Sequence, residues 1–233
     1  MTIDIITILD TETTGFKPSG DKIIELAAIL YSLKQAAPIA CFSSLIPHTS
    51  NDAARANGIS VELLATTPDK YATFARNSLN AFAADSAALV AHNAAFDRNF
   101  INAAEVLTVK KDLPWVCTMN HIAWPKVVSS KSLMAIAVAH GVAITAAHRA
   151  MTDCDILARL LTRVHELGHS LPDMFERAMT PRTLVQALVS YHDRQLAKDA
   201  NFRWDEDEEH PKKWLRECTA EELVNLPFRC VPV

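Results

Sequence analysis

Short apolar runs rich in β-branched residues open the chain and are separated by polar breaks. Three of them, residues 3–9, 23–33 and 38–46, follow one another closely and predict an antiparallel meander of three strands. Farther along, apolar positions recur at helical spacing, with short buried-type strands expected at 87–91 and 115–117. Strands followed by alternating helices and strands indicate a mixed sheet flanked by helices.

Apolar stripes at helical spacing predict a set of helices that follow this meander in the sequence. The stripes occupy residues 71–82, 96–107, 132–140 and 156–167. Gly141 and Gly168 follow the last two stripes and are expected to end those helices. Residues 171–198 also look helical, with Pro172 and Pro181 interpreted as N-terminal punctuation.

The end of the chain has a different character. Phe202–Trp204 and Trp214–Arg216 mix apolar and basic residues around the acidic stretch Asp205–Glu209, and Thr219–Glu222 has the form of a capping box. These features predict a small ββα appendage, too small to be stable unless it packs on the main body. The predicted organisation has three parts: a main domain over 1–170, a helical extension over 171–198 and the appendage over 199–233.

Composition limits the class of protein. The chain has 233 residues, 49% hydrophobic and 21% charged, which excludes intrinsic disorder. It has no long uncharged apolar run and no pattern of a secretory signal, so we expect a cytoplasmic protein without a membrane partner. The five cysteines are scattered and never form a CxxC pair, which favours reduced thiols, three or more of them in the core.

The net charge of −4 argues against binding of duplex DNA mainly by phosphate neutralisation. From residue 196 onward there are 6 Lys and Arg against 9 Asp and Glu, so the acidity is concentrated in the tail. Nucleic acid remains a candidate substrate, because divalent metals in an acidic pocket supply the positive charge that side chains lack.

The strongest local signal is the segment Asp10–Gly15, with the sequence DTETTG, at the end of the first predicted strand. Asp10 and Glu12 are two positions apart, so in an extended segment both carboxylates point to the same side. Two such carboxylates repel each other unless a cation lies between them, and hard oxygen ligands favour Mg²⁺ or Mn²⁺. An ordinary polar turn is the alternative for this motif taken alone.

Two further segments strengthen the signal. Asp97 lies in the segment HNAAFD, just after a predicted strand and in the first turn of a helix. His148 precedes Asp153 by five positions, and Asp153 opens the most amphipathic helix. Taken singly, each aspartate is compatible with a helix-terminal acid and the histidine with a surface residue. Together they fall at strand ends and helix starts, where α/β folds build their sites.

These three segments, in this order, resemble the DnaQ-like (DEDDh) family of 3′→5′ exonucleases, which includes the proofreading subunits of bacterial replicative polymerases. The resemblance covers residues 3–167. Asn57 stands where relatives often have histidine, in Asn57-Gly58-Ile59-Ser60, outside the metal-binding set. All five catalytic-type positions match, so the resemblance implies an active enzyme.

The resemblance implies a ribonuclease H-like fold, with a five-stranded mixed sheet in the order 3-2-1-4-5. It also implies two Mg²⁺ or Mn²⁺ ions per active site. The metal ligands would be Asp10, Glu12, Asp97 and Asp153. His148 would act as the general base, consistent with a reference imidazole pKa near 6.5.

Substrate contacts are implied beside these ligands. Thr11 and Thr14 would contact the 3′-terminal sugar, and Asn93 and Phe96 the scissile or neighbouring nucleotide. Phe100 would support them or stack on a base. Plain core packing is an equally good interpretation of Phe96 and Phe100.

The expected function is metal-dependent 3′→5′ hydrolysis of single-stranded or frayed ends, DNA favoured, releasing nucleoside 5′-monophosphates. Two alternatives stay open: an exoribonuclease acting on short RNA or RNA 3′ ends, and a nuclease-fold subunit whose main role is interaction. The C-terminal appendage would then contact a polymerase or repair partner, or a second copy of the chain. For the appendage we rank docking on the main body first, association second and substrate binding third, because its acidic stretch repels phosphate.

Overall fold

The computed structural model describes residues 3–110, 112–126, 128–144, 149–205 and 212–233. It divides the chain into two compact units, Met1–Met179 and Thr180–Val233. Each unit has its own sheet and its own hydrophobic core, and each is described by itself below.

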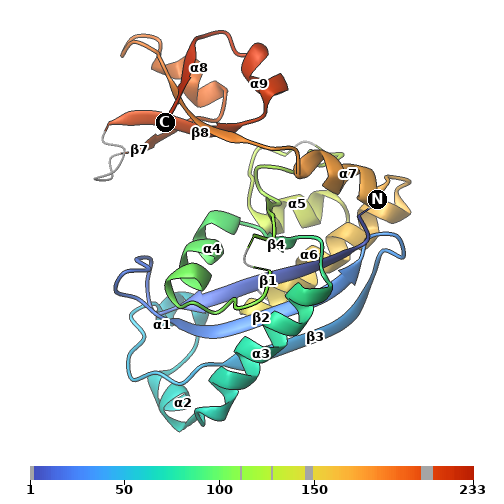
Figure 1. Ribbon diagram of the computed structural model, residues 1–233, viewed down its shortest axis with the longest axis vertical. Coiled ribbons are helices and arrows are strands. Elements are labelled where there is room, and N and C mark those ends of the chain that lie inside the picture. Colours follow the sequence, from blue (N-terminus) through green and yellow to red (C-terminus); the bar gives the residue numbers. More distant parts are fainter. Residues whose placement is uncertain (1–2, 111, 127, 145–148, 206–211) are drawn as a thin grey trace. The chain divides into compact units, whose positions relative to one another are not determined.

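The N-terminal unit alternates strands and helices after an initial strand meander (Figure 1). Its strands are β1 (Ile5–Thr13), β2 (Ile23–Ser32), β3 (Ala37–Leu45), β4 (Leu89–Ala91) and β5 (Trp115–Cys117). Its helices are α1 (Ala54–Asn57), α2 (Val61–Thr66), α3 (Lys70–Asp85), α4 (Ala94–Ala103), α5 (Leu133–Ala139), α6 (Ala150–Glu166) and α7 (Leu171–Ala178).

The sheet order is β3-β2-β1-β4-β5, which confirms the predicted ribonuclease H-like arrangement. β1 pairs antiparallel with β2 and parallel with β4. All ten residues of β2 are buried, as expected for a strand that is covered on both faces. Strand β1 runs on to Thr13, past the predicted end at Leu9, so the DTETTG motif begins inside the strand.

Two hydrophobic clusters cover the two faces of this sheet. Along β1, Ile6 and Ile8 join α5, α6 and α7, whereas Leu9 faces the cluster formed with α3 and α4. This alternation follows from the two-residue period of a strand. Asp10 and Glu12 continue the series of Ile6 and Ile8, so they are directed toward the face that α6 covers (Figure 1).

The prediction of a helix over residues 171–198 is wrong. The helix that begins at Leu171 ends at Ala178, and Thr183–Ala187 forms strand β6. Pro181 lies after this helix and disfavours its continuation, because the residue before a proline avoids the helical region. The buried side chains Val185 and Ala187 alternate with less buried neighbours, the two-residue period of a strand.

The short helix α7 belongs to the N-terminal unit, since Leu171, Met174, Phe175 and Ala178 are part of the core beneath α6. The main domain therefore extends about one helix beyond residue 170. The boundary lies at Met179, where the apolar helix face ends.

The C-terminal unit is a four-stranded antiparallel sheet with two short helices, more than the predicted ββα. Its elements are β6 (Thr183–Ala187), α8 (Arg194–Asp199), β7 (Arg203–Asp205), β8 (Lys213–Cys218), α9 (Ala220–Val224) and β9 (Cys230–Pro232). The sheet order is β7-β8-β6-β9, so β6 pairs with strands from both parts of the tail.

The hydrophobic cluster of this unit is small: among the described residues it has five buried apolar members and a shell of partly buried ones, and Leu215 is buried outside it. The buried set is Val185, Ala187, Ala197, Phe202 and Cys218. The predicted capping box is present at α9: the Thr219 hydroxyl accepts from the backbone N–H of Glu222, and the Glu222 carboxylate accepts from the N–H of Thr219.

Two expectations from composition can be compared with the structure. All five cysteines are free thiols, and Cys117, Cys154 and Cys218 are buried, as predicted. Among the described residues, no helix combines the length and the apolar character that a bilayer crossing requires.

Candidate active site

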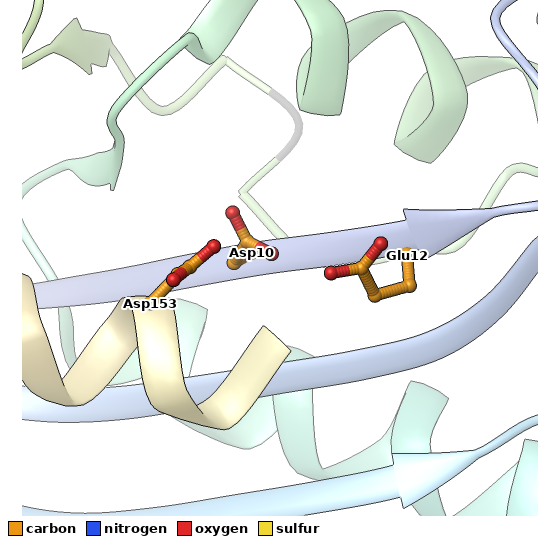
Figure 2. A group of neighbouring side chains, drawn as sticks. All are labelled: Asp10, Glu12 and Asp153. Atoms are coloured by element: carbon orange, nitrogen blue, oxygen red, sulfur yellow. The ribbon is translucent and has the colours of Figure 1, made fainter. Parts of the chain in front are cut away.

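Three carboxylates meet at the carboxyl end of β1. Asp10 and Glu12 come from β1 and Asp153 from the first turn of α6, and one oxygen of each lies within 4.8 Å of the others. Figure 2 shows their side chains turned toward a common space between the strand and the helix start. The structure thus brings together three of the four predicted metal ligands.

The electrostatics of this cluster are unfavourable without a cation. Burial raises the pKa of Asp10 well above its ordinary value, and the charges of Asp97, Asp153 and Glu12 raise it further. Burial and the neighbouring carboxylates raise the pKa of Glu12 to about 7. Because these groups resist ionisation together, a hard divalent cation fits the oxygen donor set and would relieve the repulsion.

Asp97, the fourth predicted ligand, lies in the first turn of α4 and is buried. One of its carboxylate oxygens accepts from the backbone N–H of Thr11 at 3.0 Å and from the Thr11 hydroxyl at 2.8 Å. Burial raises the pKa of Asp97 to about 7, although the bonds from Thr11 oppose the shift. These bonds fix Asp97 against β1, near enough for its charge to act on Asp10.

The start of α6 is held by Glu25, which the sequence analysis missed. Glu25 lies opposite Glu12 in the β1–β2 pairing and is only 2% exposed. Its carboxylate accepts two bonds from the Arg149 guanidinium, at 3.0 and 2.8 Å, and one from the backbone N–H of Ala150 at 3.1 Å. A bidentate contact of this kind fixes orientation, so Glu25 anchors the helix that carries Asp153.

A usable signal for this pair was present in the sequence. Glu25 interrupts an otherwise apolar strand, Ile23–Leu33, and a carboxylate buried there needs a cationic partner. The identity of that partner, 124 positions away, was not accessible from local spacing.

The loop after β1 explains the glycine of the DTETTG motif. A Cβ on Gly15 would lie 2.6 Å from the carboxylate of Asp21, so any side chain there would displace that group. The Asp21 carboxylate accepts from the Thr14 hydroxyl and from the backbone N–H of Lys17. The Thr14 hydroxyl, a predicted substrate contact, is therefore engaged in closing this loop.

An aromatic row lies beside the same loop. Phe96 is partly buried and contacts the deeply buried Phe100, with ring centroids 4.9 Å apart. Phe16 is 82% exposed and makes an edge-to-face contact with Phe96, with ring centroids 6.5 Å apart. Phe100, at 1% exposure, is a core residue that supports Phe96, whereas Phe16 is an exposed aromatic that the sequence analysis overlooked.

The remaining predicted residues are placed as follows. Asn93 is exposed and precedes the first residue of α4. Asn57, at the family histidine position, is buried and its side-chain amide donates to the backbone carbonyl of Thr13, so it supports the end of β1. His148 lies outside the described residues.

Comparison with known proteins identifies the family. A sequence model of the RNase_T family, described as "Exonuclease", matches residues 7–161. The chain belongs to this exonuclease family. The predicted membership among DnaQ-like 3′→5′ exonucleases is thereby confirmed, and the acidic cluster lies inside the matched exonuclease region.

A relative of the exonuclease chain is the DNA polymerase III subunit epsilon of Treponema pallidum (strain Nichols). It is 33% identical over 170 residues, covering 67% of this chain and 74% of the relative. A second family model, described as a "Domain of unknown function (DUF8626)", matches residues 183–233. The C-terminal unit of this exonuclease is thus a separate module in sequence as well as in structure.

Solved structures show the same fold at low identity. The nuclease domain of 3′hExo, described as a DEDDh family member bound to rAMP, has a TM-score of 0.57 and 16% identity. That match covers 71% of this chain and 94% of the nuclease domain. Exonuclease I of E. coli in complex with a dT13 oligonucleotide has a TM-score of 0.59 and 12% identity, over 99% of this chain and 66% of that chain.

Proposed function

We propose that this exonuclease removes nucleotides from the 3′ end of single-stranded or frayed nucleic acid, DNA favoured, and releases nucleoside 5′-monophosphates. The observation that carries the proposal is the convergence of Asp10, Glu12 and Asp153 within 4.8 Å, with Asp97 held beside them. A phosphodiester is an anion and is repelled by carboxylates. Four carboxylates at its binding site are therefore expected to act as ligands of bound cations.

We propose Asp10, Glu12, Asp97 and Asp153 as the residues that hold two divalent cations, Mg²⁺ or Mn²⁺. When bound, such cations neutralise charge on the phosphodiester and polarise its phosphoryl oxygens. The protein supplies the preorganisation: Thr11 fixes Asp97, and Glu25 with Arg149 fixes the start of the helix that carries Asp153.

His148 is proposed as the general base that takes the proton from the attacking water. Its support is its position, five residues ahead of Asp153 and next to the anchored Arg149. A base with a pKa near 6.5 can accept that proton near neutral pH.

The terminal nucleotide is proposed to lie between the loop after β1 and the start of α4. Asn93 is exposed there, and Phe16 and Phe96 offer ring surface for stacking on a base. The Thr11 and Thr14 hydroxyls donate hydrogen bonds to Asp97 and Asp21. We propose that the same hydroxyl oxygens accept hydrogen bonds from the terminal sugar.

The substrate assignment draws on relatives. The E. coli exonuclease I structure contains a dT13 oligonucleotide and the 3′hExo nuclease domain contains rAMP, a nucleoside monophosphate. DNA is favoured because the relative at 33% identity is a DNA polymerase III subunit.

The test uses end-blocked oligonucleotides with and without EDTA. The wild-type enzyme should digest a 5′-blocked strand, fail on a 3′-blocked strand, leave circular single strands intact and stop when EDTA is added. A matched RNA series decides the substrate class. Efficient cutting of circles, or activity of Asp10→Ala in EDTA, would contradict the proposal.

A second proposal concerns association with a DNA polymerase. It is favoured by the 33% identity to a polymerase III subunit that extends over 74% of that subunit. Co-migration of the purified chain with a purified replicative polymerase subunit in size-exclusion chromatography tests it. Separate elution at micromolar concentrations would contradict stable association.

A further inference from the structure

The C-terminal unit contains a pocket that the proposed hydrolysis does not use. Its volume is about 490 Å³, and residues from β6, α8, β7 and β8 line it together with the segment between β6 and α8. All of the lining residues belong to this one unit. The described lining of the pocket is therefore formed within one unit.

Aromatic rings form part of the wall. Trp204 and Trp214 are directly opposite each other on β7 and β8. Their ring centroids are 5.2 Å apart and their ring planes meet at 60°, an edge-to-face contact. Trp214 packs on the small core of the unit, whereas Trp204 is 46% exposed. Tyr191 is 75% exposed, so its ring is accessible to a ligand.

Among the residues that the structure describes, the charged side chains of the wall are all cations. They are Arg194, Lys198, Lys212 and Lys213. The Arg194 guanidinium lies 4.0 Å from the centre of the Tyr191 ring, and the Lys198 ammonium lies 6.0 Å from the centre of the Trp214 ring. Rings and cations side by side form a surface suited to a flat aromatic group that is joined to phosphate.

These cations differ from three arginines elsewhere in the unit. Arg182 and Arg216 both pair with Glu222, and Arg203 pairs with Asp205. Within the part of the chain that the structure describes, none of the four pocket cations pairs with a carboxylate. No described carboxylate therefore neutralises their charge.

We propose that this pocket binds single-stranded nucleic acid, with bases against Tyr191 and Trp204 and phosphates near the four cations. The proposal deepens the proposed function and rests on it for the identity of the substrate. Aromatic stacking accepts any base, and cations beside the rings follow the backbone, the combination that sequence-tolerant single-strand binding requires. A free phosphate would use the cations but leave the rings without a role.

The acidic stretch 206–209 follows Asp205 in the sequence, and its carboxylates carry the charge that repels phosphate. We expect it to weaken the interaction without abolishing it. Replacing its carboxylates with amides should therefore tighten binding, an effect opposite in sign to that of removing pocket cations. This pair of changes separates a nucleic-acid site from a neutral apolar surface.

Binding is measured on the full chain in EDTA, where hydrolysis is absent, with labelled oligothymidylate of about 16 nucleotides, the upper site size of a single-strand module. Tyr191→Ala and Trp204→Ala should each raise the dissociation constant about tenfold, the lower range of base stacking on an aromatic residue. The double variant Arg194→Gln, Lys198→Gln should weaken binding and reduce its salt dependence.

Matched controls lie outside the pocket. Tyr71 on α3 is 43% exposed with the Lys70 ammonium 5.3 Å from its ring centre, so Tyr71→Ala repeats the chemistry elsewhere and should leave affinity unchanged. Arg203→Gln removes a cation of β7 that is paired with Asp205, and it should also leave the affinity for oligothymidylate unchanged. An oligouridylate arm distinguishes RNA from DNA as the strand that is bound.

The two proposals fail separately. Asp10→Ala should abolish hydrolysis and keep oligothymidylate binding, whereas Tyr191→Ala should keep hydrolysis of a substrate of about four nucleotides. Wild-type affinity in Tyr191→Ala and Trp204→Ala, or full competition by millimolar inorganic phosphate, would overturn the pocket assignment. Because Tyr191 is mostly exposed, its replacement does not disturb the core.

Discussion

The two units of this chain gather opposite charges in their sites. In the N-terminal unit, carboxylates of β1, α4 and α6 converge, and their burial raises the pKa values of Asp10, Glu12 and Asp97. In the C-terminal unit, cations and exposed rings line a pocket, with no carboxylate among its described lining residues. A net charge of −4 therefore says little about either site.

The difference also concerns how each site is supported. The carboxylates stand on long elements between two extensive hydrophobic clusters, so their positions are fixed before any cation binds. The pocket cations lie on or beside short elements of the C-terminal unit, whose hydrophobic cluster has five buried members among the described residues. We therefore expect substitutions in the N-terminal unit to act on turnover and those in the pocket to act on binding.

The largest effect is expected for Asp153→Ala. Removing one of three converging carboxylates should lower kcat at least about a thousandfold, since cation-assisted charge stabilisation contributes several kcal/mol. Steady-state digestion of a single-stranded oligonucleotide measures this. Asp155→Ala is the control on the same helix, because Asp155 is exposed and pairs only at 3.7 Å with Arg159. Equal losses in both variants would refute the site assignment.

His148→Ala is expected to lower kcat by about two to four orders of magnitude, the usual contribution of a general base. The wild-type profile of rate against pH should fall on the acid side as imidazole becomes protonated. His165→Ala, in the last turn of α6, serves as control. A wild-type rate and pH profile in His148→Ala would place the base elsewhere.

Replacing the anchor of α6 should have an intermediate effect. Glu25→Gln keeps the shape but loses the charge that binds Arg149, and we expect a loss of about tenfold to a hundredfold in Mn²⁺ affinity and turnover. Isothermal titration with Mn²⁺ supplies the readout. Arg163→Met, which removes an exposed pair with Glu166 on the same helix, should leave Mn²⁺ affinity unchanged.

The metal-free enzyme should lose stability as pH rises. The pKa values of Glu12 and Asp97 are raised to about 7, so between about pH 4 and 7 the folded state binds more protons than the unfolded state. Stability must therefore fall across this range in EDTA. Mg²⁺ at a hundred times its Kd at pH 8 should add about 2.7 kcal/mol of stability there, and the same concentration should add less at pH 5.

Urea unfolding at the two pH values, with EDTA or Mg²⁺, measures this linkage. Asp10→Asn removes one of the coupled carboxylates and should flatten the pH dependence in EDTA. A metal-free protein that becomes more stable from pH 5 to pH 8 would contradict the shifts.

The smallest effect is expected when the chain is shortened at Met179. This cut follows the boundary between the units and removes none of the proposed active-site residues, so digestion of a very short substrate should stay within about twofold of wild type. A cut after Lys198 is the informative comparison. It leaves β6 without its partners β8 and β9 and should yield a less soluble protein. Equal behaviour of both truncations would contradict the four-stranded sheet.

Local patterns determined a large part of the fold. The β-branched runs, the helical stripes and the capping box at Thr219 depend on neighbours in sequence, and each is present. The pairing of Asp10 and Glu12 also followed from sequence, because alternate residues of a strand share a face. The single helix expected over 171–198 does not form. The helix that begins at Leu171 ends at Ala178, and the pairing of β6 with β8 and β9 outweighs the weak helical pattern of the following residues.

Only the tertiary structure decided which distant groups meet. The sequence alone indicated the family, the acidic motifs and the order of the strands. It did not reveal that Glu25 anchors Arg149, that Thr11 fixes Asp97, or that Phe16 approaches Phe96. Nor did it show that Tyr191 and Arg194 share a pocket with Trp204. The physical reason is that strand and helix periods are local, whereas the contacts of a buried charge or an exposed ring depend on how those elements pack.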